Sequence, residues 1–155
     1  MHRIAPLLLA AAGAMPALEL DERRRATFAA IADNRYDLHY LDHRLGAQGR
    51  DNWLSFNLHR PKGVSGALPC VVLVHGGGFG AGDKNGNWPT PLIAAFTKAG
   101  FAVANIKYIL GSEAPRGEGI MPLVHYDFRA CIRHLRAQSA DYGIDPDRIA
   151  ALGCS

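Results

Sequence analysis

Three short runs of apolar residues constrain the fold of this chain more than any other feature of its sequence. They occupy residues 70–74, 101–106 and 149–152, and the first is continuously apolar, as expected for a strand that is covered on both faces of a sheet. The segments between them, 90–99 and 127–139, carry apolar residues at helical spacing. Strands that alternate with helices predict an α/β fold: a mostly parallel sheet with right-handed crossovers and helices on both faces.

Two earlier segments alternate apolar and polar residues, which predicts half-buried antiparallel strands at the edge of that sheet. They span residues 36–41 and 53–58, and a short helix is expected before them, over residues 21–33. The residues expected to share the inward side are Tyr36, Leu38 and Tyr40 in the first strand and Leu54, Phe56 and Leu58 in the second.

The first residues resemble an export signal. An apolar run follows His2 and Arg3 from residue 4 to 14 and ends in Ala-Gly-Ala, which fits an A-x-A cleavage pattern. The run is too short to span a bilayer, and no later segment is long enough to do so. We therefore predict a signal peptide at residues 1–17, a partial domain at 18–155, and a secreted or periplasmic protein. The alternatives are a buried N-terminal segment and a cytoplasmic protein.

Composition and charge exclude several classes of protein. The 155 residues carry 17 Lys and Arg against 14 Asp and Glu, a net charge of +3, which is too small a basic footprint for a nucleic-acid binder. No Cys/His spacing resembles a zinc site, and no metal or other cofactor is predicted. The three cysteines, Cys70, Cys131 and Cys154, are too few for a disulfide framework and are expected to be small buried hydrophobic residues.

The strongest motif is His75-Gly76-Gly77-Gly78-Phe79, directly after the first apolar strand. Glycines adopt positive φ freely and let the backbone approach a ligand closely. Backbone N–H groups that have no strand partner can face a developing negative oxygen, as in an oxyanion hole. The alternatives are a glycine-rich turn without a ligand and a phosphate loop. The motif lacks the Gly-Lys-Ser/Thr ending of a phosphate loop, and the next helix begins too late for a dinucleotide fingerprint.

The chain ends in Gly153-Cys154-Ser155, the first half of a G-x-S-x-G pattern, placed after an apolar strand. A serine at a sharp turn between strand and helix holds its hydroxyl clear of the sheet, where a base can reach it. Three residues alone are weak evidence. Their position two strands after the glycine motif makes the combination specific.

From about residue 68 to its end the chain resembles the α/β-hydrolase superfamily, most of all carboxylesterases with an HGGG oxyanion loop. In detail it is similar to the bifunctional feruloyl and acetyl-xylan esterase-like group. The matching pieces are Val74-His-Gly-Gly-Gly-Phe79, Gly82-Asp-Lys84, Ala102-Val-Ala-Asn-Ile106 with Tyr108, Asp127, and Gly143-Ile-Asp-Pro-Asp-Arg-Ile149 leading to Gly153-Cys-Ser155.

The resemblance implies that Ser155 is the nucleophile and that the amides of Gly77 and Gly78 are the oxyanion donors. Gly76 is also assigned to the oxyanion hole, with His75 and Asp83 shaping the loop. One departure is Ile109, which stands where the family commonly has arginine, so that a structural ion pair is expected to be missing.

In this fold the catalytic acid and histidine follow the serine. The resemblance therefore implies the N-terminal half of a hydrolase that lacks both residues. The other candidates are given structural roles: His75 in the loop, Asp83 with Lys84 after it, Asp127 at a helix start, where its charge suits the helix dipole, and His125 and His134, with His134 on the outer side of its helix.

The predicted function is that of a serine carboxylic ester hydrolase of the esterase or lipase type, acting on a small-molecule or carbohydrate ester such as an acylated polysaccharide. The 155-residue polypeptide is expected to be inactive alone, because exposed apolar surface and an incomplete triad are predicted. Two alternatives stay open, a non-catalytic truncated domain and a serine peptidase of the same fold. The sequence predicts no oligomeric state.

Overall fold

The computed structural model describes residues 20–43, 52–114, 117 and 119–154. The signal peptide predicted at residues 1–17, the connection between the two predicted front strands at residues 44–51, and Ser155 lie outside the described residues. The elements follow one another in the predicted order of a helix, two strands, and then alternating strands and helices.

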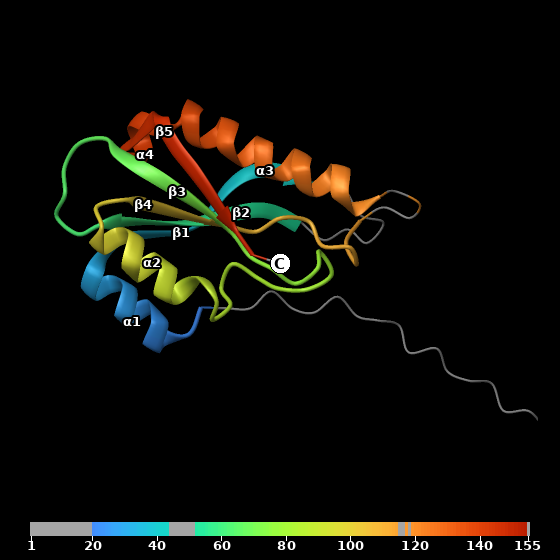
Figure 1. The fold of residues 1–155 in the computed structure, drawn as a ribbon, viewed down its shortest axis with the longest axis horizontal. Coiled ribbons are helices and arrows are strands. Elements are labelled where there is room, and N and C mark those ends of the chain that lie inside the picture. The colour runs from blue at the N-terminus through green and yellow to red at the C-terminus, as the bar shows by residue number, and fades with distance from the viewer. Residues whose placement is uncertain (1–19, 44–51, 115–116, 118, 155) are drawn as a thin grey trace, which may run out of the picture.

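A mixed five-stranded sheet forms the centre of the molecule, with the strand order β1-β2-β4-β3-β5 (Figure 1). The strands are β1 (Ala32–His43), β2 (Asn52–Pro61), β3 (Leu68–Val74), β4 (Ala102–Ile106) and β5 (Ile144–Gly153). The β1–β2 and β2–β4 pairs are antiparallel, whereas β3 is parallel to both β4 and β5. The prediction of a parallel sheet extended by an antiparallel front pair is confirmed.

Helices cover both faces of the sheet, as predicted (Figure 1). The helices α1 (Glu22–Ile31) and α2 (Pro89–Lys98) lie on one face, and α3 (Ile120–Ala137) and the single turn α4 (Ser139–Tyr142) lie on the other. Asp21 caps α1 by accepting a hydrogen bond from the N–H of Arg24, and Gly100, at φ +88°, follows the end of α2.

Two apolar layers hold these elements together. On the α3 side, Leu54, Phe56 and Leu58 of β2 pack with Cys131 and Leu135 of α3. On the α1 and α2 side, the core comprises Leu20, Phe28, Val71, Leu73, Ile93 and Val103. Burying a large apolar side chain stabilises a fold by about 1.5–3 kcal/mol, so these layers fix the sheet that carries the site.

The inward face predicted for β1 is wrong at Tyr36. Leu38 and Tyr40 pack in the α3 layer, but Tyr36 packs in the opposite layer, against α1. The register with β2 shifts between Arg35 and Leu38, and Asp37 there has φ +53°. One extra residue in a strand reverses the side on which the following residues point, and this bulge separates Tyr36 from its expected partners.

Strand β2 is buried on both faces rather than half-buried. Ser55, Asn57 and His59, which alternate with its apolar residues, are all buried. The reason is its place in the sheet: β2 lies between β1 and β4 and is covered by helices on either side. Of the two strands predicted at the edge, only β1 lies there.

Helix α3 starts at Ile120, seven residues before the predicted start at Asp127. Pro122 lies in its first turn, where a missing N–H breaks no helical hydrogen bond. The dipole argument for Asp127 therefore fails, because this carboxylate lies in the middle of the helix and is fully buried.

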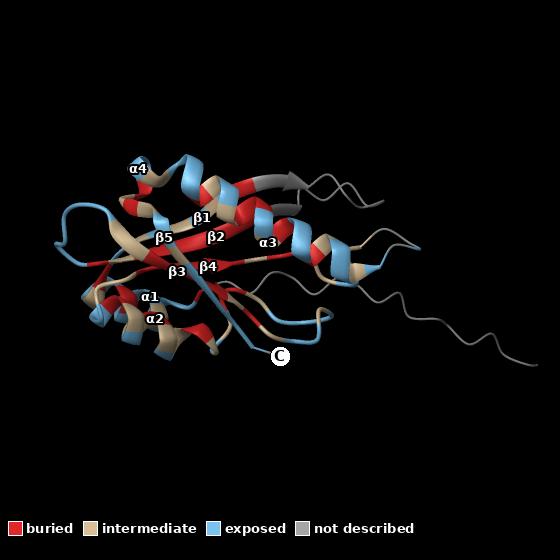
Figure 2. Ribbon diagram, turned by 45° about the horizontal axis from the view of Figure 1, so that its top comes forward, coloured by how far each residue is buried: buried red, intermediate tan, exposed pale blue. Residues whose placement is uncertain are grey.

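Strand β5 differs from the buried strand that its apolar sequence predicts. Its residues Ala150, Ala151 and Leu152 are exposed, and so is Cys154 after it (Figure 2). This strand is the edge of the sheet beyond β3. Among the described helices, α3 and α4 contact it. Cys70 and Cys131 are buried as predicted, whereas the burial predicted for Cys154 is wrong. Burial raises the pKa of the Cys70 thiol to about 12.

Candidate active site

The glycine motif forms a tight loop after β3. The φ angles of Gly77, Gly78 and Phe79 are +127°, +58° and +61°, all in the left-handed half of backbone space that glycine tolerates best. The carbonyl oxygen of Gly77 accepts hydrogen bonds from the N–H groups of Gly80 and Ala81, both at 3.1 Å. The loop therefore closes on itself within five residues.

The N–H groups of Gly77 and Gly78 are not part of any strand ladder. Strand β3 ends at Val74, and among the described residues no group accepts a hydrogen bond from either amide. Both glycines are exposed, whereas Gly76 is half-buried and its carbonyl oxygen lies 3.0 Å from Nδ1 of His75. Exposed, unpaired N–H groups in a fixed loop can bind an oxygen that carries negative charge.

His75 is a buried part of this loop. Its ring stacks on that of Tyr108, with 4.3 Å between the ring centroids, and the Tyr108 hydroxyl donates a hydrogen bond to the His75 carbonyl oxygen at 2.7 Å. Burial lowers the pKa of His75, although its contact with the Gly76 carbonyl and the charge of Asp83 oppose that effect. The imidazole is therefore neutral at pH 7 and donates through Nδ1 to the Gly76 carbonyl.

The segment after β4 supports the loop from the other side. The N–H of Gly111 donates to the carbonyl oxygen of Phe79 at 2.7 Å, and the N–H of Ile109 donates to Asp127 Oδ2 at 2.9 Å. Ile109 is itself buried in a small apolar cluster with Tyr108 and Val124. Ile109 stands where the family commonly has arginine, and here its backbone N–H, not a side chain, binds the Asp127 carboxylate.

Asp83 lies at the far end of the glycine loop. Its Oδ1 accepts a hydrogen bond from the N–H of Asn85 at 2.7 Å, and its carbonyl oxygen accepts one from the N–H of Gly86 at 3.0 Å. These bonds fold residues 83–86 into a turn. The carboxylate thus organises its own segment.

The carboxyl end of β5 lies beside the carboxyl end of β3 (Figure 1). Gly153 pairs with Val74, and a Cβ placed on Gly153 would be 3.6 Å from the carbonyl oxygen of Val74. The pKa of Tyr108 is raised by burial and, to a lesser degree, by the charge of Cys154. Val74 and Gly153, which lie 79 positions apart in the sequence, thus meet at the edge of the sheet formed by the carboxyl ends of its parallel strands.

The remaining sequence candidates lie away from this edge or point elsewhere. The prediction that His134 lies on the outer side of α3 is wrong. Its Nε2 lies 2.8 Å from the Tyr142 hydroxyl, and its ring packs against Phe56. The apolar stripe of α3 and this polar pair share the sheet-facing side. His125 is exposed on the same helix.

Sequence reasoning missed the roles of Tyr108 and of two asparagines. It did not foresee the bond from the Tyr108 hydroxyl to the His75 carbonyl, nor the buried positions of Asn57 and Asn105 in the middle of the sheet. The available signal was an amide side chain in each strand, Asn57 in an alternating strand and Asn105 in an otherwise apolar one, since buried amides usually form hydrogen bonds.

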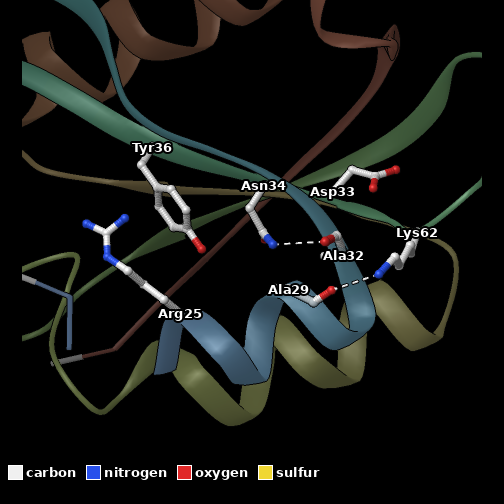
Figure 3. Close-up of a pocket in the computed structure, with 7 residues that line it drawn as sticks. All are labelled: Arg25, Ala29, Ala32, Asp33, Asn34, Tyr36 and Lys62. Carbon is white, nitrogen blue, oxygen red and sulfur yellow. Dashed lines mark hydrogen bonds between the residues drawn. The ribbon is translucent and has the colours of Figure 1, made fainter. Parts of the chain in front are cut away.

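An open hollow of about 340 Å³ lies between α1 and β1, at the end of the sheet away from the glycine loop (Figure 3). Its polar groups bond mainly to the protein itself: Asn34 Nδ2 donates to the Ala32 carbonyl oxygen and Lys62 Nζ to that of Ala29. The Arg25 guanidinium stacks on the Tyr36 ring at 4.8 Å. The hollow is a surface feature separate from the loop.

The described residues contain no cluster of three or more His, Cys, Asp or Glu side chains that could hold a metal ion. In the same part of the chain, every helix is too short or too polar to cross a membrane.

The mixed sheet, the helices on its two faces and the loop that follows β3 define an α/β-hydrolase fold. Residues 56–155 match the BD-FAE family model, which describes bifunctional feruloyl and acetyl-xylan esterase-like proteins. The chain belongs to this family.

Known esterases have the same fold. The native structure of a thermophilic esterase, Est2, from Thermogutta terrifontis superposes with a TM-score of 0.62 at 23% identity, covering 80% of this chain and 40% of the esterase. A truncated carbohydrate esterase from gut microbiota gives a TM-score of 0.61 at 24% identity, covering 81% and 40%. Gut esterase 1 of Caenorhabditis briggsae is 29% identical over 114 residues, 68% of this chain and 19% of that protein. The chain thus spans about two fifths of these solved structures and a fifth of this relative.

Proposed function

We propose that the protein carrying this chain is a serine carboxylic ester hydrolase in which Ser155 is the nucleophile. The observation that carries the proposal is the pairing of Gly153 with Val74. Two residues beyond Gly153, the chain reaches Ser155, and directly beyond Val74 begins the loop with the unpaired amides of Gly77 and Gly78. A nucleophile and a pair of N–H donors at one sheet edge are what acyl transfer requires.

In this mechanism the Ser155 hydroxyl attacks the ester carbonyl carbon and loses its proton to a histidine base. The carbonyl oxygen becomes an oxyanion that accepts hydrogen bonds from the Gly77 and Gly78 amides. The protonated histidine then gives its proton to the departing alcohol, and water hydrolyses the acyl-enzyme by the same steps in reverse. The proposal assigns the histidine and its acid partner to residues that follow Ser155 in the natural protein.

Neutral His75 does not serve as the base in this proposal. Its Nδ1 is directed to the Gly76 carbonyl, and its ring is stacked on Tyr108. A base must reach the nucleophile's proton within about 2.6–3.2 Å, which a ring held inside the loop is not free to do. His75 and Asp83 are proposed to shape the loop.

Esters of polysaccharides, with acetyl or feruloyl groups, are the proposed substrate class, in line with the family to which the chain belongs. Export through the segment at residues 1–17 would bring the enzyme to such polymers. Both points extend the family assignment and need their own tests: release of acetate or ferulate from xylan, and the N-terminal residue of the mature protein.

The central test uses the natural gene product that carries this sequence. We expect hydrolysis of p-nitrophenyl acetate, and labelling by a fluorophosphonate probe that peptide mass spectrometry maps to Ser155. Ser155→Ala should abolish both, while Cys154→Ala, the matched neighbour, should retain both. Labelling at another residue, or full activity of Ser155→Ala, would disprove the proposal. Cleavage of peptides with no cleavage of esters would favour a peptidase instead.

We further propose that the polypeptide of residues 1–155 has no activity by itself. Besides His75, which is held inside the loop, His59 is bonded to Asn34 and His134 to Tyr142, and neither of these two lies beside the loop. The isolated polypeptide should therefore resist the fluorophosphonate probe. Labelling of its Ser155 at the rate of the natural protein would contradict this proposal.

A further inference from the structure

A buried lysine lies directly after the glycine loop. The Lys84 side chain is only 4% exposed, and its Nζ donates a hydrogen bond to Asp37 Oδ1 at 2.6 Å. Lysine is almost never buried in this way unless it is paired. Asp37 belongs to the bulge in β1, where its φ of +53° departs from strand geometry. The bulge therefore presents a carboxylate to the segment that follows the glycine loop.

The backbone around Lys84 is held by two amide side chains of the sheet. Asn105 Nδ2 donates to the Lys84 carbonyl oxygen, and Asn57 Nδ2 donates to Asn85 Oδ1 at 2.8 Å. The Arg24 guanidinium of α1 donates to the Asn85 carbonyl oxygen. Residues 84 and 85 are thus hydrogen-bonded to the central strands β2 and β4 and to helix α1.

The two asparagines are neighbours in the sheet, since Asn57 pairs with Asn105 across β2 and β4. Both are buried between apolar neighbours in their own strands, and Asn57 Oδ1 also accepts the N–H of Asp37 at 3.0 Å. One amide therefore contacts both partners of the ion pair: the backbone of Asp37 and, through Asn85, the segment of Lys84. These hydrogen bonds hold the bulge, the two central strands and the Lys84 segment in one arrangement.

Residues 81 and 82, which precede this segment in the chain, pack closely against the glycine loop. A Cβ on Gly82 would lie 2.3 Å from the Gly76 carbonyl oxygen and 2.5 Å from His75 Nδ1, and one on Gly77 would lie 2.2 Å from the Ala81 carbonyl oxygen. The first half of the loop therefore packs directly against residues 81 and 82, which Asp83 joins to Lys84. A movement of the Lys84 segment would be passed to the backbone of Gly76 and Gly77.

We propose that Lys84, held by Asp37, is a positioning residue that sets the orientation of the Gly77 and Gly78 amides. This inference rests on the proposed function, because it concerns the oxyanion donors of that reaction. In this role Lys84 acts through the loop and not on the substrate itself. It fixes the segment that follows the residues against which the donor loop packs. The bulge in β1 places the Asp37 carboxylate where it pairs with the Lys84 ammonium group.

A positioning role predicts a particular kinetic signature. Misplacing a reacting group by about 1 Å can cost about 100-fold in rate, and an oxyanion donor acts more strongly in the transition state than in the ground state. Lys84→Met keeps the length of the apolar stem but removes the ammonium group. We expect its kcat to fall by about 10- to 100-fold, with KM changed by less than about 3-fold.

The experiment measures p-nitrophenyl acetate hydrolysis by the natural gene product, with kcat normalised to sites titrated by a fluorophosphonate. A trifluoromethyl ketone inhibitor, whose adduct with the serine places an oxyanion between the donor amides, is measured in parallel. In Lys84→Met its inhibition constant should rise by the same factor by which kcat/KM falls. A purely structural role would lower the melting temperature and the number of titrated sites and leave both per-site quantities unchanged.

Two further variants keep the test decisive if Lys84→Met folds poorly. Asp37→Asn keeps a residue that tolerates positive φ and removes only the charge, and we expect a fall in kcat of about 3- to 10-fold. The double variant Asp37→Asn/Lys84→Met should be no slower than Lys84→Met alone, within about 2-fold, because both changes break one interaction. Lys62→Met, the same substitution at an exposed lysine beside α1, is the control and should retain the wild-type kcat.

The outcomes separate the two proposals. Absence of esterase activity in the wild-type protein, or full activity of Ser155→Ala, would refute the proposed function. An active wild-type enzyme that depends on Ser155, with wild-type per-site kcat and inhibitor affinity in Lys84→Met or Asp37→Asn, would refute the positioning role alone.

Discussion

Replacing Gly77 by alanine tests the geometry of the glycine loop most directly. The new Cβ would lie 2.2 Å from the carbonyl oxygen of Ala81 and 2.6 Å from its carbonyl carbon, whereas real Cβ contacts are essentially never shorter than 3.0 Å. The difference between 3.0 and 2.2 Å requires a backbone shift of about 0.8 Å, because the obstructing atoms are not those of a flexible side chain. The φ of +127° adds strain of about 1–3 kcal/mol for a residue with a Cβ.

That shift would displace an amide proposed as an oxyanion donor by nearly 1 Å. We therefore expect Gly77→Ala to lower kcat/KM for p-nitrophenyl acetate by about 100-fold or more. The free energy of unfolding, measured in urea, should fall by about 2–4 kcal/mol. Both assays use the natural gene product that carries this sequence.

Gly78→Ala is the matched comparison. Its φ is +58°, but a Cβ there would meet no atom within 4 Å. The expected cost is only the left-handed conformation, about 1 kcal/mol, with a loss of activity of less than about 10-fold. If the two variants had equal activity and equal stability, the argument that backbone contact with Ala81 fixes the loop would be wrong.

Three further predictions concern the surroundings of the site. Tyr108→Phe removes the buried hydroxyl that donates to the His75 carbonyl oxygen and should reduce the free energy of unfolding by about 1–2 kcal/mol in urea titrations; a change below about 0.3 kcal/mol would show that the bond contributes nothing. Burial lowers the pKa of His59 to about 4 from its ordinary 6.5. As the pH falls between these values, the unfolded chain binds a proton at His59 and the folded chain does not. The free energy of unfolding should therefore fall by about 2 kcal/mol between pH 7 and pH 5. In His59→Gln this part of the pH dependence should vanish, and an unchanged pH profile would contradict the assignment. In the folded polypeptide of residues 1–155, iodoacetamide should alkylate exposed Cys154 rapidly and buried Cys70 and Cys131 only after denaturation, and mass spectrometry that finds all three modified equally fast would contradict the burial.

The order of elements and the glycine motif could be predicted because both are written in local patterns. The apolar run of β3 and the helical spacing of residues 90–99 depend on nearby residues only, and the structure confirms them as β3 and α2. The same holds for Leu54, Phe56 and Leu58, which lie together in one layer as expected.

The features that sequence reasoning missed depend on contacts between distant segments. The bulge that turns Tyr36 to the opposite layer is stabilised by Asn57 and Lys84, which lie 20 and 47 positions away from Asp37. The early start of α3 was hidden by Pro122, which ends helices elsewhere but is tolerated in a first turn. A lysine after a glycine-rich loop gives no local sign that it is buried, since most lysines are exposed.

The two hydrogen bonds that converge on the Gly77 carbonyl oxygen, from Gly80 and Ala81, have a consequence for how this enzyme family can diversify. A turn closed in this way has a fixed number of residues, because one added residue would separate the donors from their shared acceptor. New substrate preferences should therefore arise by exchanging side chains on this turn or by remodelling other segments, and natural homologues should differ at Phe79 far more readily than in the spacing between Gly77 and Ala81.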